Sequence, residues 1–150
     1  MKSVKFFSLL GMTIVIATSF ILVGCSQKRS SKTASSSGKR ISSLQSVYFD
    51  FDKSSIRGNQ RSVLNDNAQW LKQNKSKKVR VAGNCDDRGT EEYNIALGQR
   101  RANSVRNFLV SSGVSGSRIS TISYGEEKGT CSAQTEGCWA KNRRADFNKK

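Results

Sequence analysis

The sequence contains no histidine, and only 11 of its 150 residues are acidic, against 26 lysines and arginines. The missing imidazole removes the side chain that most often acts as a general base near neutral pH. It also excludes zinc sites that depend on histidine ligands. No serine-centred nucleophile motif is visible, and Asp86 and Asp87 are sequence neighbours that need not converge in space. We therefore predict a protein that is not an enzyme and that uses no metal or cofactor.

The shortage of acidic residues leaves a formal net charge of +15. A charge of this size commonly indicates a protein that binds nucleic acid. An exported protein, however, meets anionic lipid head groups and cell-wall carboxylates rather than nucleic acid. The partner that this charge indicates therefore depends on the compartment of the protein. The N-terminal segment predicts that compartment.

A long apolar run lies at the N-terminus behind two lysines, and it ends with Leu-Val-Gly-Cys at residues 22–25. This layout is typical of a bacterial secretory signal peptide. The ending resembles a lipobox, where cleavage leaves Cys25 as a lipidated first residue, anchored by several acyl chains. Ser26 in place of aspartate indicates the outer membrane, by resemblance to lipoprotein sorting signals. An uncleaved transmembrane helix is the alternative, because about 18 apolar residues could just span a bilayer.

Residues 26–40 form a polar segment that is rich in serine and basic residues and has no large apolar side chain. Such a composition cannot bury enough surface to offset the entropy lost on ordering. We therefore predict three parts in the chain. They are a lipoprotein signal peptide over residues 1–24, a lipidated N-terminus with a flexible tether over 25–46, and a folded domain over 47–150.

Within the domain, segments whose apolar residues have the spacing of a strand alternate with segments that have the spacing of a helix. Three segments with β-branched or aromatic residues predict strands, over residues 47–51, 78–84 and 118–124, and residues 144–147 are predicted as a short final strand. Amphipathic spacing predicts helices over 61–73 and 91–112, the second capped by Thr90 and stopped by Gly113. The order β-α-β-α-β-β predicts an α/β (α+β) two-layer sandwich, with two main helices on one face of a mixed sheet.

Three cysteines remain once Cys25 is assigned to lipid. Cys131 and Cys138 flank a short polar loop, and in an oxidising periplasm we expect a disulfide between them. Two free thiols are the alternative. We expect Cys85 to be a small buried apolar residue rather than a reactive thiol.

The second predicted helix and the loop before it hold the charged residues of greatest interest. Asn94 and Arg101 share a helical stripe with Leu97 and Val105, so they lie on or beside the face that packs on the sheet. Asp86 follows the preceding strand at its carboxyl end, where ligands collect in α/β layers. Facing each other across a shallow pocket, Asp86 and Arg101 would hold the ammonium and the carboxylate of an amino acid. A plain salt bridge between them is the alternative.

The segment Val81–Ala102, which carries these residues, resembles the signature of OmpA-like peptidoglycan-binding domains. Segments 48–52, 123–125 and 142–144 match the same family in the same order. The resemblance covers about residues 47–147. It implies the same β-α-β-α-β-β sandwich as the periodicity.

The resemblance also implies a set of peptidoglycan contacts, made by Asp86, Arg101, Asn94, Asp52, Arg143 and Arg144. Asp86 and Arg101 would grip meso-diaminopimelate of the stem peptide, Asn94 would support them, and Asp52 would lie at the other rim of the pocket. One of the two consecutive arginines would close it. Lipidated members of the family also bind the periplasmic propeller protein of the Tol system. The implied function is a tether between outer membrane and cell wall that serves envelope integrity and cell division.

Two other functions fit parts of the sequence. A basic periplasmic binder of an anionic polymer or lipopolysaccharide would depend on net charge, and its binding would fall with salt without depending on Asp86. A cell-wall hydrolase would need Asp86 or Asp52 as its acid or base, and the sequence shows no paired acid–base constellation around them.

Overall fold

The computed structural model describes residues 43–149. The predicted signal peptide, Cys25 and all but the last residues of the predicted tether lie outside this range. In chain order the elements are β1 (Val47–Tyr48), a 3-10 turn (Gly58–Gln60), α1 (Arg61–Gln73), β2 (Val79–Asn84), α2 (Glu91–Ser111), a second 3-10 turn (Gly116–Arg118), β3 (Ile119–Gly125), α3 (Glu136–Asn142) and β4 (Arg144–Lys149). Within this range, no helix has the length and apolar character needed to cross a membrane.

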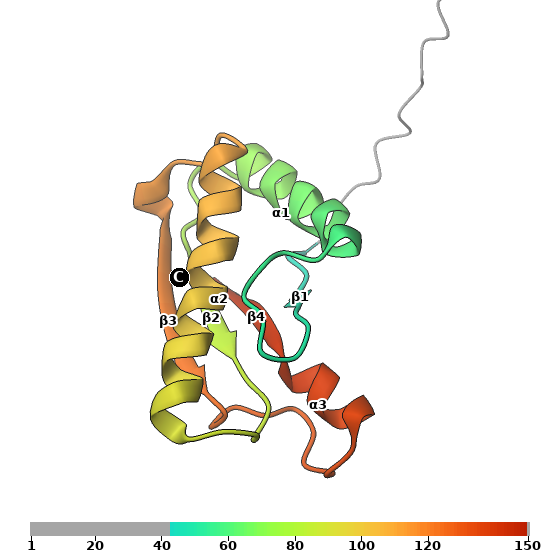
Figure 1. Ribbon diagram of the computed structural model, residues 1–150. Helices are drawn as coiled ribbons and strands as arrows, with labels where there is room; N and C mark the ends of the chain where they lie inside the picture. The colour runs from blue at the N-terminus through green and yellow to red at the C-terminus, as the bar shows by residue number, and fades with distance from the viewer. Residues whose placement is uncertain (1–42, 150) are drawn as a thin grey trace, which may run out of the picture. The chain divides into compact units, whose positions relative to one another are not determined.

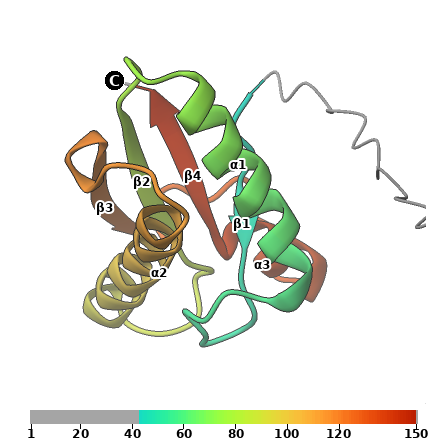
Figure 2. The same ribbon diagram turned by 90° about the horizontal axis from the view of Figure 1, so that it is seen from above.

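The four strands form one mixed sheet in the order β1-β4-β2-β3. β2 and β3 run parallel, whereas β4 runs antiparallel to both β1 and β2. α1 and α2 pack on the same face of this sheet (Figures 1 and 2), and their apolar residues share one core with it. The predicted two-layer sandwich with two main helices on one face is confirmed.

The core follows from the two periodicities of the sequence. Alternate residues of β2, Val79 and Val81, point toward the helices and are fully buried. α1 and α2 meet them with residues at helical spacing, which are Leu64, Leu71, Val105 and Leu109. All the core residues of the described part lie between residues 44 and 147. A chain that begins at Ser43 therefore keeps the whole described core.

Two glycines let the backbone of α2 approach that of β2 closely. A Cβ atom on Gly83 would lie only 1.8 Å from the carbonyl oxygen of Gly98. A Cβ on Gly98 would lie 2.2 Å from the hydroxyl of Ser123 on β3. Any larger side chain would force the helix away from the sheet, so these glycines set the position of the first half of α2 beside the end of β2.

The first strand is shorter than the predicted 47–51 and ends at Tyr48. Beyond it the chain turns, and Asp52 takes a positive φ of 53°. The carbonyl oxygens of Asp50 and Lys53 accept hydrogen bonds from the guanidinium of Arg101 instead of joining a strand ladder. A charged side chain from α2 therefore replaces the sheet as the partner of this loop.

The second difference is α3, which lies partly inside the segment that the sequence analysis treated as a polar loop. Its short polar sequence carries no apolar stripe, so its periodicity gave no helix signal. The structure holds it by a disulfide and by contacts to residues distant in sequence, described below. The final strand also extends past the predicted 144–147, to Lys149, because β2 supplies a pairing partner along that length.

Candidate functional site

The candidate site lies at the carboxyl end of β2, where the chain passes through residues 85–90 into α2. The helix begins as predicted: the hydroxyl of Thr90 accepts a hydrogen bond from the backbone N–H of Tyr93 at 3.2 Å. Gly89 adopts a φ of 120°, a conformation that L side chains rarely take. This turn brings the loop back over the start of α2 and directs Asp86 and Arg88 toward one pocket.

Asp86 is a buried carboxylate, with 4% of its surface exposed. Its Oδ2 atom accepts hydrogen bonds from Arg88 at 2.7 Å and from Arg143 at 3.0 Å. Burial by itself would favour the neutral acid, but the two arginines outweigh it and lower the pKa of Asp86 below its usual value. Its Oδ1 atom accepts no hydrogen bond from the described residues. Asp86 is therefore ionised at neutral pH, with one oxygen left for a ligand.

Arg88 lies between two aromatic rings. Its guanidinium carbon is 4.0 Å from the ring centre of Phe51 and 4.2 Å from that of Trp139. The Nη2 atom bonds Asp86 and reaches Glu136 at 3.5 Å. The Nη1 atom donates no hydrogen bond within residues 43–149. The rings hold the guanidinium in place while that nitrogen stays available.

These side chains line a pocket of about 270 Å³, formed by Phe51, Asp52, Asp86, Arg88, Gly89, Tyr93 and Leu97. Phe51 and Tyr93 are 52% and 44% exposed, so both rings are only partly covered by the rest of the domain. Across the pocket, the hydroxyl of Tyr93 donates a hydrogen bond to the carboxylate of Asp52. The pocket therefore combines apolar walls with carboxylates and one guanidinium, and it is small enough to suit a group the size of an amino acid.

Arg101 lies behind this pocket rather than in its wall, which differs from the expected arrangement. It is fully buried, and its three nitrogens donate to backbone carbonyls: Nε to Lys53 at 2.9 Å, Nη1 to Asn84 at 2.9 Å and Nη2 to Asp50 at 3.2 Å. Within the described residues it forms no salt bridge with Asp86. In this conformation Arg101 ties the loop after β1 to the end of β2, and so positions both edges of the pocket.

Asn94 also acts on the loop rather than in the pocket. It is buried, and its Nδ2 atom donates to the carboxylate of Glu126 at 2.5 Å and to the carbonyl oxygens of Asp86 and Arg88 at 3.2 and 3.4 Å. These bonds hold the loop on the first turn of α2. Asn94 was expected to support the ligand contacts. In the structure it contacts the backbone of Asp86 and Arg88.

The structure separates the two consecutive arginines. Arg143 donates to Asp86 at 3.0 Å and to Glu136 at 2.5 Å, so it stands directly behind the pocket. Arg144 points elsewhere and bonds Asp146 at 2.9 Å and the carbonyl of Lys128 at 3.0 Å. Of the pair, only Arg143 contacts the candidate site.

The disulfide-bonded segment forms one side of the site. Cys131 and Cys138 are joined by a disulfide, with an S–S distance of 2.09 Å. Two residues beside Cys138 take part in the site: Glu136 bonds Arg88 and Arg143, and the indole N–H of Trp139 donates to Asp87 at 2.7 Å. α3 therefore fixes the orientation of both arginines around Asp86.

Cys85 is the remaining described cysteine, and it lies free and buried beside Arg101. Burial raises the pKa of its thiol, an effect that Arg101 reduces only in part. A thiol with a raised pKa is a weak nucleophile. This placement matches the expected small buried residue.

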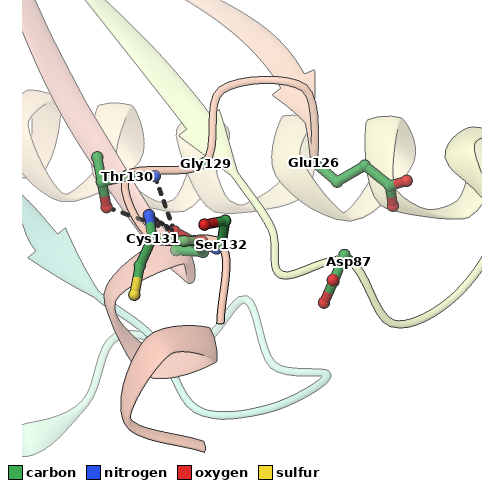
Figure 3. A pocket seen from close by; sticks show the side chains of 7 residues that line it. Asp87, Glu126, Gly129, Thr130, Cys131 and Ser132 are labelled. Carbon is green, nitrogen blue, oxygen red and sulfur yellow. Dashed lines mark hydrogen bonds between the residues drawn. The ribbon is translucent and has the colours of Figure 1, made fainter. Parts of the chain in front are cut away.

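A larger pocket of about 430 Å³ has Asp87 in its wall (Figure 3). Its lining residues are Asp87, Glu126, Gly129, Thr130, Cys131, Ser132 and Asn142. Both oxygens of Asp87 and one of Glu126 already accept hydrogen bonds from protein side chains. The amide of Asn142 is committed to the backbone of Thr130 and Cys131. Most of its polar groups are thus used internally, and we place the candidate site in the smaller pocket.

Sequence reasoning missed Arg88, Phe51, Tyr93, Glu136 and Trp139. Arg88 stood inside the signature, two residues after Asp86, and a search for cations next to the acid would have found it. Phe51 and Tyr93 gave no separate signal, because they fell within the predicted strand 47–51 and the predicted helix 91–112. Glu136 and Trp139 are about 50 residues from Asp86 in sequence, so only the folded chain brings them there. No group of three potential metal ligands occurs within residues 43–149.

Comparison with known proteins gives consistent results. Residues 48–143 match the OmpA family. The chain is 50% identical over 99 residues to the peptidoglycan-associated lipoprotein of Mesorhizobium japonicum, covering 66% of this chain but only 59% of that protein. It is 41% identical over 138 residues to that of Pasteurella multocida, covering 88% and 92%. The crystal structure of the peptidoglycan-associated lipoprotein from Burkholderia pseudomallei superimposes with a TM-score of 0.68 at 42% identity, over 71% of this chain and 90% of that one.

Proposed function

The chain belongs to the OmpA family, and from this membership and the pocket beside Asp86 we propose that it binds peptidoglycan without catalysis and ties the outer membrane to the cell wall. The names of its relatives support this assignment, because they are peptidoglycan-associated lipoproteins. The predicted lipobox supports an anchor at Cys25 in the outer membrane, with the domain facing the periplasm. Mass spectrometry of the mature N-terminus tests acylation and cleavage together.

The observation that carries the proposal is the open Oδ1 atom of Asp86, held as an anion in a pocket of amino-acid size. The free end of meso-diaminopimelate in a stem peptide is a zwitterion, with an ammonium group and a carboxylate on one carbon. Asp86 would accept hydrogen bonds from the ammonium, and Asp52 at the rim would add a second negative charge. Charge-assisted hydrogen bonds of this kind are the strong ones in such sites.

The carboxylate of the ligand has two candidate partners. Arg88 lines the pocket, and its Nη1 atom donates no hydrogen bond within residues 43–149, so it is a partner that needs no bond to be released. Arg101 is the partner that the family resemblance implies, but its nitrogens are bonded to the carbonyls of Asp50, Lys53 and Asn84. It would reach the ligand only if the loop after β1 released it. We therefore propose Arg88 for the first contact and Arg101 for one that follows a loop movement.

The expected intrinsic affinity is modest. A charge-assisted hydrogen bond contributes about 1.5–3 kcal/mol net, so two or three such bonds do not give tight binding. Lipid anchoring places many copies beside a repeating polymer, and this raises the effective concentration. A weak single site is then sufficient for a tether.

Co-sedimentation with purified sacculi tests the proposal. We expect a chain of residues 43–150 to pellet with diaminopimelate-containing walls and not with lysine-containing walls, whose side-chain end lacks the carboxylate. Asp86→Asn keeps the size of the side chain and removes the charge, and we expect it to reduce pelleting at least tenfold. Asp66→Asn, on α1, is the control and should pellet normally. Undiminished pelleting of folded Asp86→Asn would remove the proposed site.

A role in the Tol system and in cell division belongs to the same proposal and rests on the resemblance to lipidated family members. Purified Tol propeller protein should bind the domain in a pull-down that needs no lipid. A hydrolase would instead release muropeptides from the sacculi during the pelleting experiment, and we expect none.

A further inference from the structure

The charges of the described domain are divided between its two ends. The acidic residues other than Asp66 and Asp146 lie at the end that holds the site, in its loops and in the first turns of α2 and α3, at Asp50, Asp52, Asp86, Asp87, Glu91, Glu92, Glu126, Glu127 and Glu136. At that end Arg57, Arg88 and Arg143 form salt bridges with these acids, whereas Lys53, Lys128 and Lys141 are exposed and form none within residues 43–149. The acids offset most of the positive charge at this end, so the excess positive charge of residues 43–149 lies mainly elsewhere.

The opposite end of the domain, which we call the basic end, consists of Lys72, Lys75, Lys77, Lys78, Arg106, Arg118 and Lys149. The sheet register places these residues together: Val79, which follows Lys78, pairs with Lys149 on one side and with Ile119, which follows Arg118, on the other. α1 and α2 both finish at this end, opposite α3 (Figure 1), and the end of β4 lies beside the loop between α1 and β2 (Figure 2).

The cations of the basic end have no acidic partners among the described residues. Arg118 donates to the carbonyls of Leu71, Asn74 and Lys77, and Arg106 donates to that of Ile119. The lysines are exposed. Carbonyl partners fix the positions of the two arginines without neutralising them, so the basic end presents its full positive charge to its surroundings.

The direction of the chain before β1 and an exposed apolar residue indicate the kind of surface that the basic end fits. β1 and β2 run in the same direction, because both pair antiparallel with β4, so residues 43–46 approach β1 from the side of the basic end. Val110, in the last turn of α2, is 39% exposed beside Arg106. An apolar side chain among cations suits the interface of a lipid bilayer better than a purely polar polymer.

We propose that the basic end is a docking surface for an anionic phospholipid bilayer, against which the domain lies with its pocket facing away. The proposal rests on the proposed function for the presence of a membrane at the anchor. The basic end and the pocket lie at opposite ends of the domain, because β2 begins at the basic end and finishes at the pocket. A domain docked in this way would present Asp86 to the wall, whereas an undocked domain on its tether would have no preferred orientation.

Vesicle co-sedimentation of the 43–150 chain tests this surface without the lipid or the basic tether. The probe is vesicles of phosphatidylglycerol and phosphatidylethanolamine, at about 50 mM and 150 mM salt, because exposed charges are screened over about 8 Å at the higher value. We expect binding to the anionic vesicles that weakens with salt, and none to phosphatidylcholine vesicles. Changing Lys72, Lys75, Lys77 and Lys78 to Gln should lower the partition coefficient by about 600-fold, since each of the four charges is worth roughly fivefold near an anionic surface.

The matched control removes the same number of exposed or partly exposed charges elsewhere, by changing Lys53, Arg61, Lys128 and Lys141 to Gln. It should bind vesicles within about threefold of the unchanged chain. An equal loss in both variants would show that net charge alone acts and would overturn a defined surface, as would no binding of the unchanged chain at low salt. A double reversal, Lys75→Glu with Lys77→Glu, provides a second variant should the fourfold change unfold the domain.

Peptidoglycan pelleting of the same proteins separates the two proposals. We expect the basic-end variant to pellet with sacculi as well as the unchanged chain, and Asp86→Asn to keep its vesicle binding. Loss of sacculus binding by the basic-end variant with intact vesicle binding would assign this surface to the wall polymer and overturn the membrane proposal. Failure of Asp86→Asn to affect sacculi would remove the pocket proposal only.

Discussion

Asp86 joins two arginines through one oxygen, and its other oxygen accepts no hydrogen bond from the described residues. Its Oδ2 atom joins Arg88, from the same loop, to Arg143, from the far end of the chain. Removing a charge that satisfies a buried partner usually costs more than the pair itself contributes. A loss of binding in an Asp86 variant therefore has to be compared with its loss of stability.

The lowered pKa of Asp86 predicts how stability depends on pH. A carboxyl whose pKa is lower in the folded than in the unfolded state stabilises the fold fully above its unfolded value, and this contribution is lost as the pH falls through the folded value. We expect Asp86→Asn to lower the free energy of unfolding by about 2 kcal/mol at pH 7. The difference from the unchanged chain should shrink below about pH 4, as measured by urea denaturation across pH. A difference that stays constant from pH 7 to pH 2 would contradict this account.

At the scale of elements, the contact of α2 with β2 decides where the pocket lies. The Gly83–Gly98 approach leaves no room for a methyl group. We expect Gly83→Ala to destabilise the domain by about 3 kcal/mol or more, because the clash is with backbone, which cannot rotate away. Gly58→Ala is the control, since a Cβ atom there has no neighbour within 4 Å. Thermal denaturation of the two variants measures the difference, and equal melting temperatures would refute the close approach.

The disulfide and α3 form the second element on which the site depends. Replacing Cys131 and Cys138 by Ser should destabilise the domain by about 2–3 kcal/mol on the chain-entropy account. We also expect a several-fold loss of sacculus binding at temperatures where the domain stays folded, because Glu136 and Trp139 orient Arg88 and Arg143. Treating the unchanged chain with a dithiol reductant should reproduce both effects. Normal sacculus binding by the folded double variant would show that α3 does not position the site.

At the scale of the whole molecule, the fold places an acidic and mixed-charge end opposite a basic one. Taken by itself, the strongly positive composition suggested a nucleic-acid partner. The run of lysines over residues 72–78, taken by itself, is most often a solvated surface. The sheet register adds Arg118, which precedes β3, and Lys149 of β4 to that run, and the acids gather at the end that holds the pocket. The distribution of charge, rather than its sum, therefore supports two separate surfaces.

Much of the architecture was determined by the sequence itself. The two long helices, the positions of the strands and the N-cap at Thr90 follow from local periodicity and capping chemistry, which act between residues close in the chain. The burial of Arg101 and Asn94 follows from the same stripe of α2. These features need no knowledge of distant partners.

The contacts of those buried groups, in contrast, depend on the three-dimensional fold. Arg101 bonds carbonyls of a loop about 50 residues away, where the sequence suggested a partner in Asp86, and Arg143 takes that place. The pocket wall likewise combines residues near 51, 88 and 93 with support from α3. Hydrogen-bond partners of a buried charge are chosen by three-dimensional proximity and competition among donors and acceptors, and neither quantity is encoded in the spacing of residues along the chain.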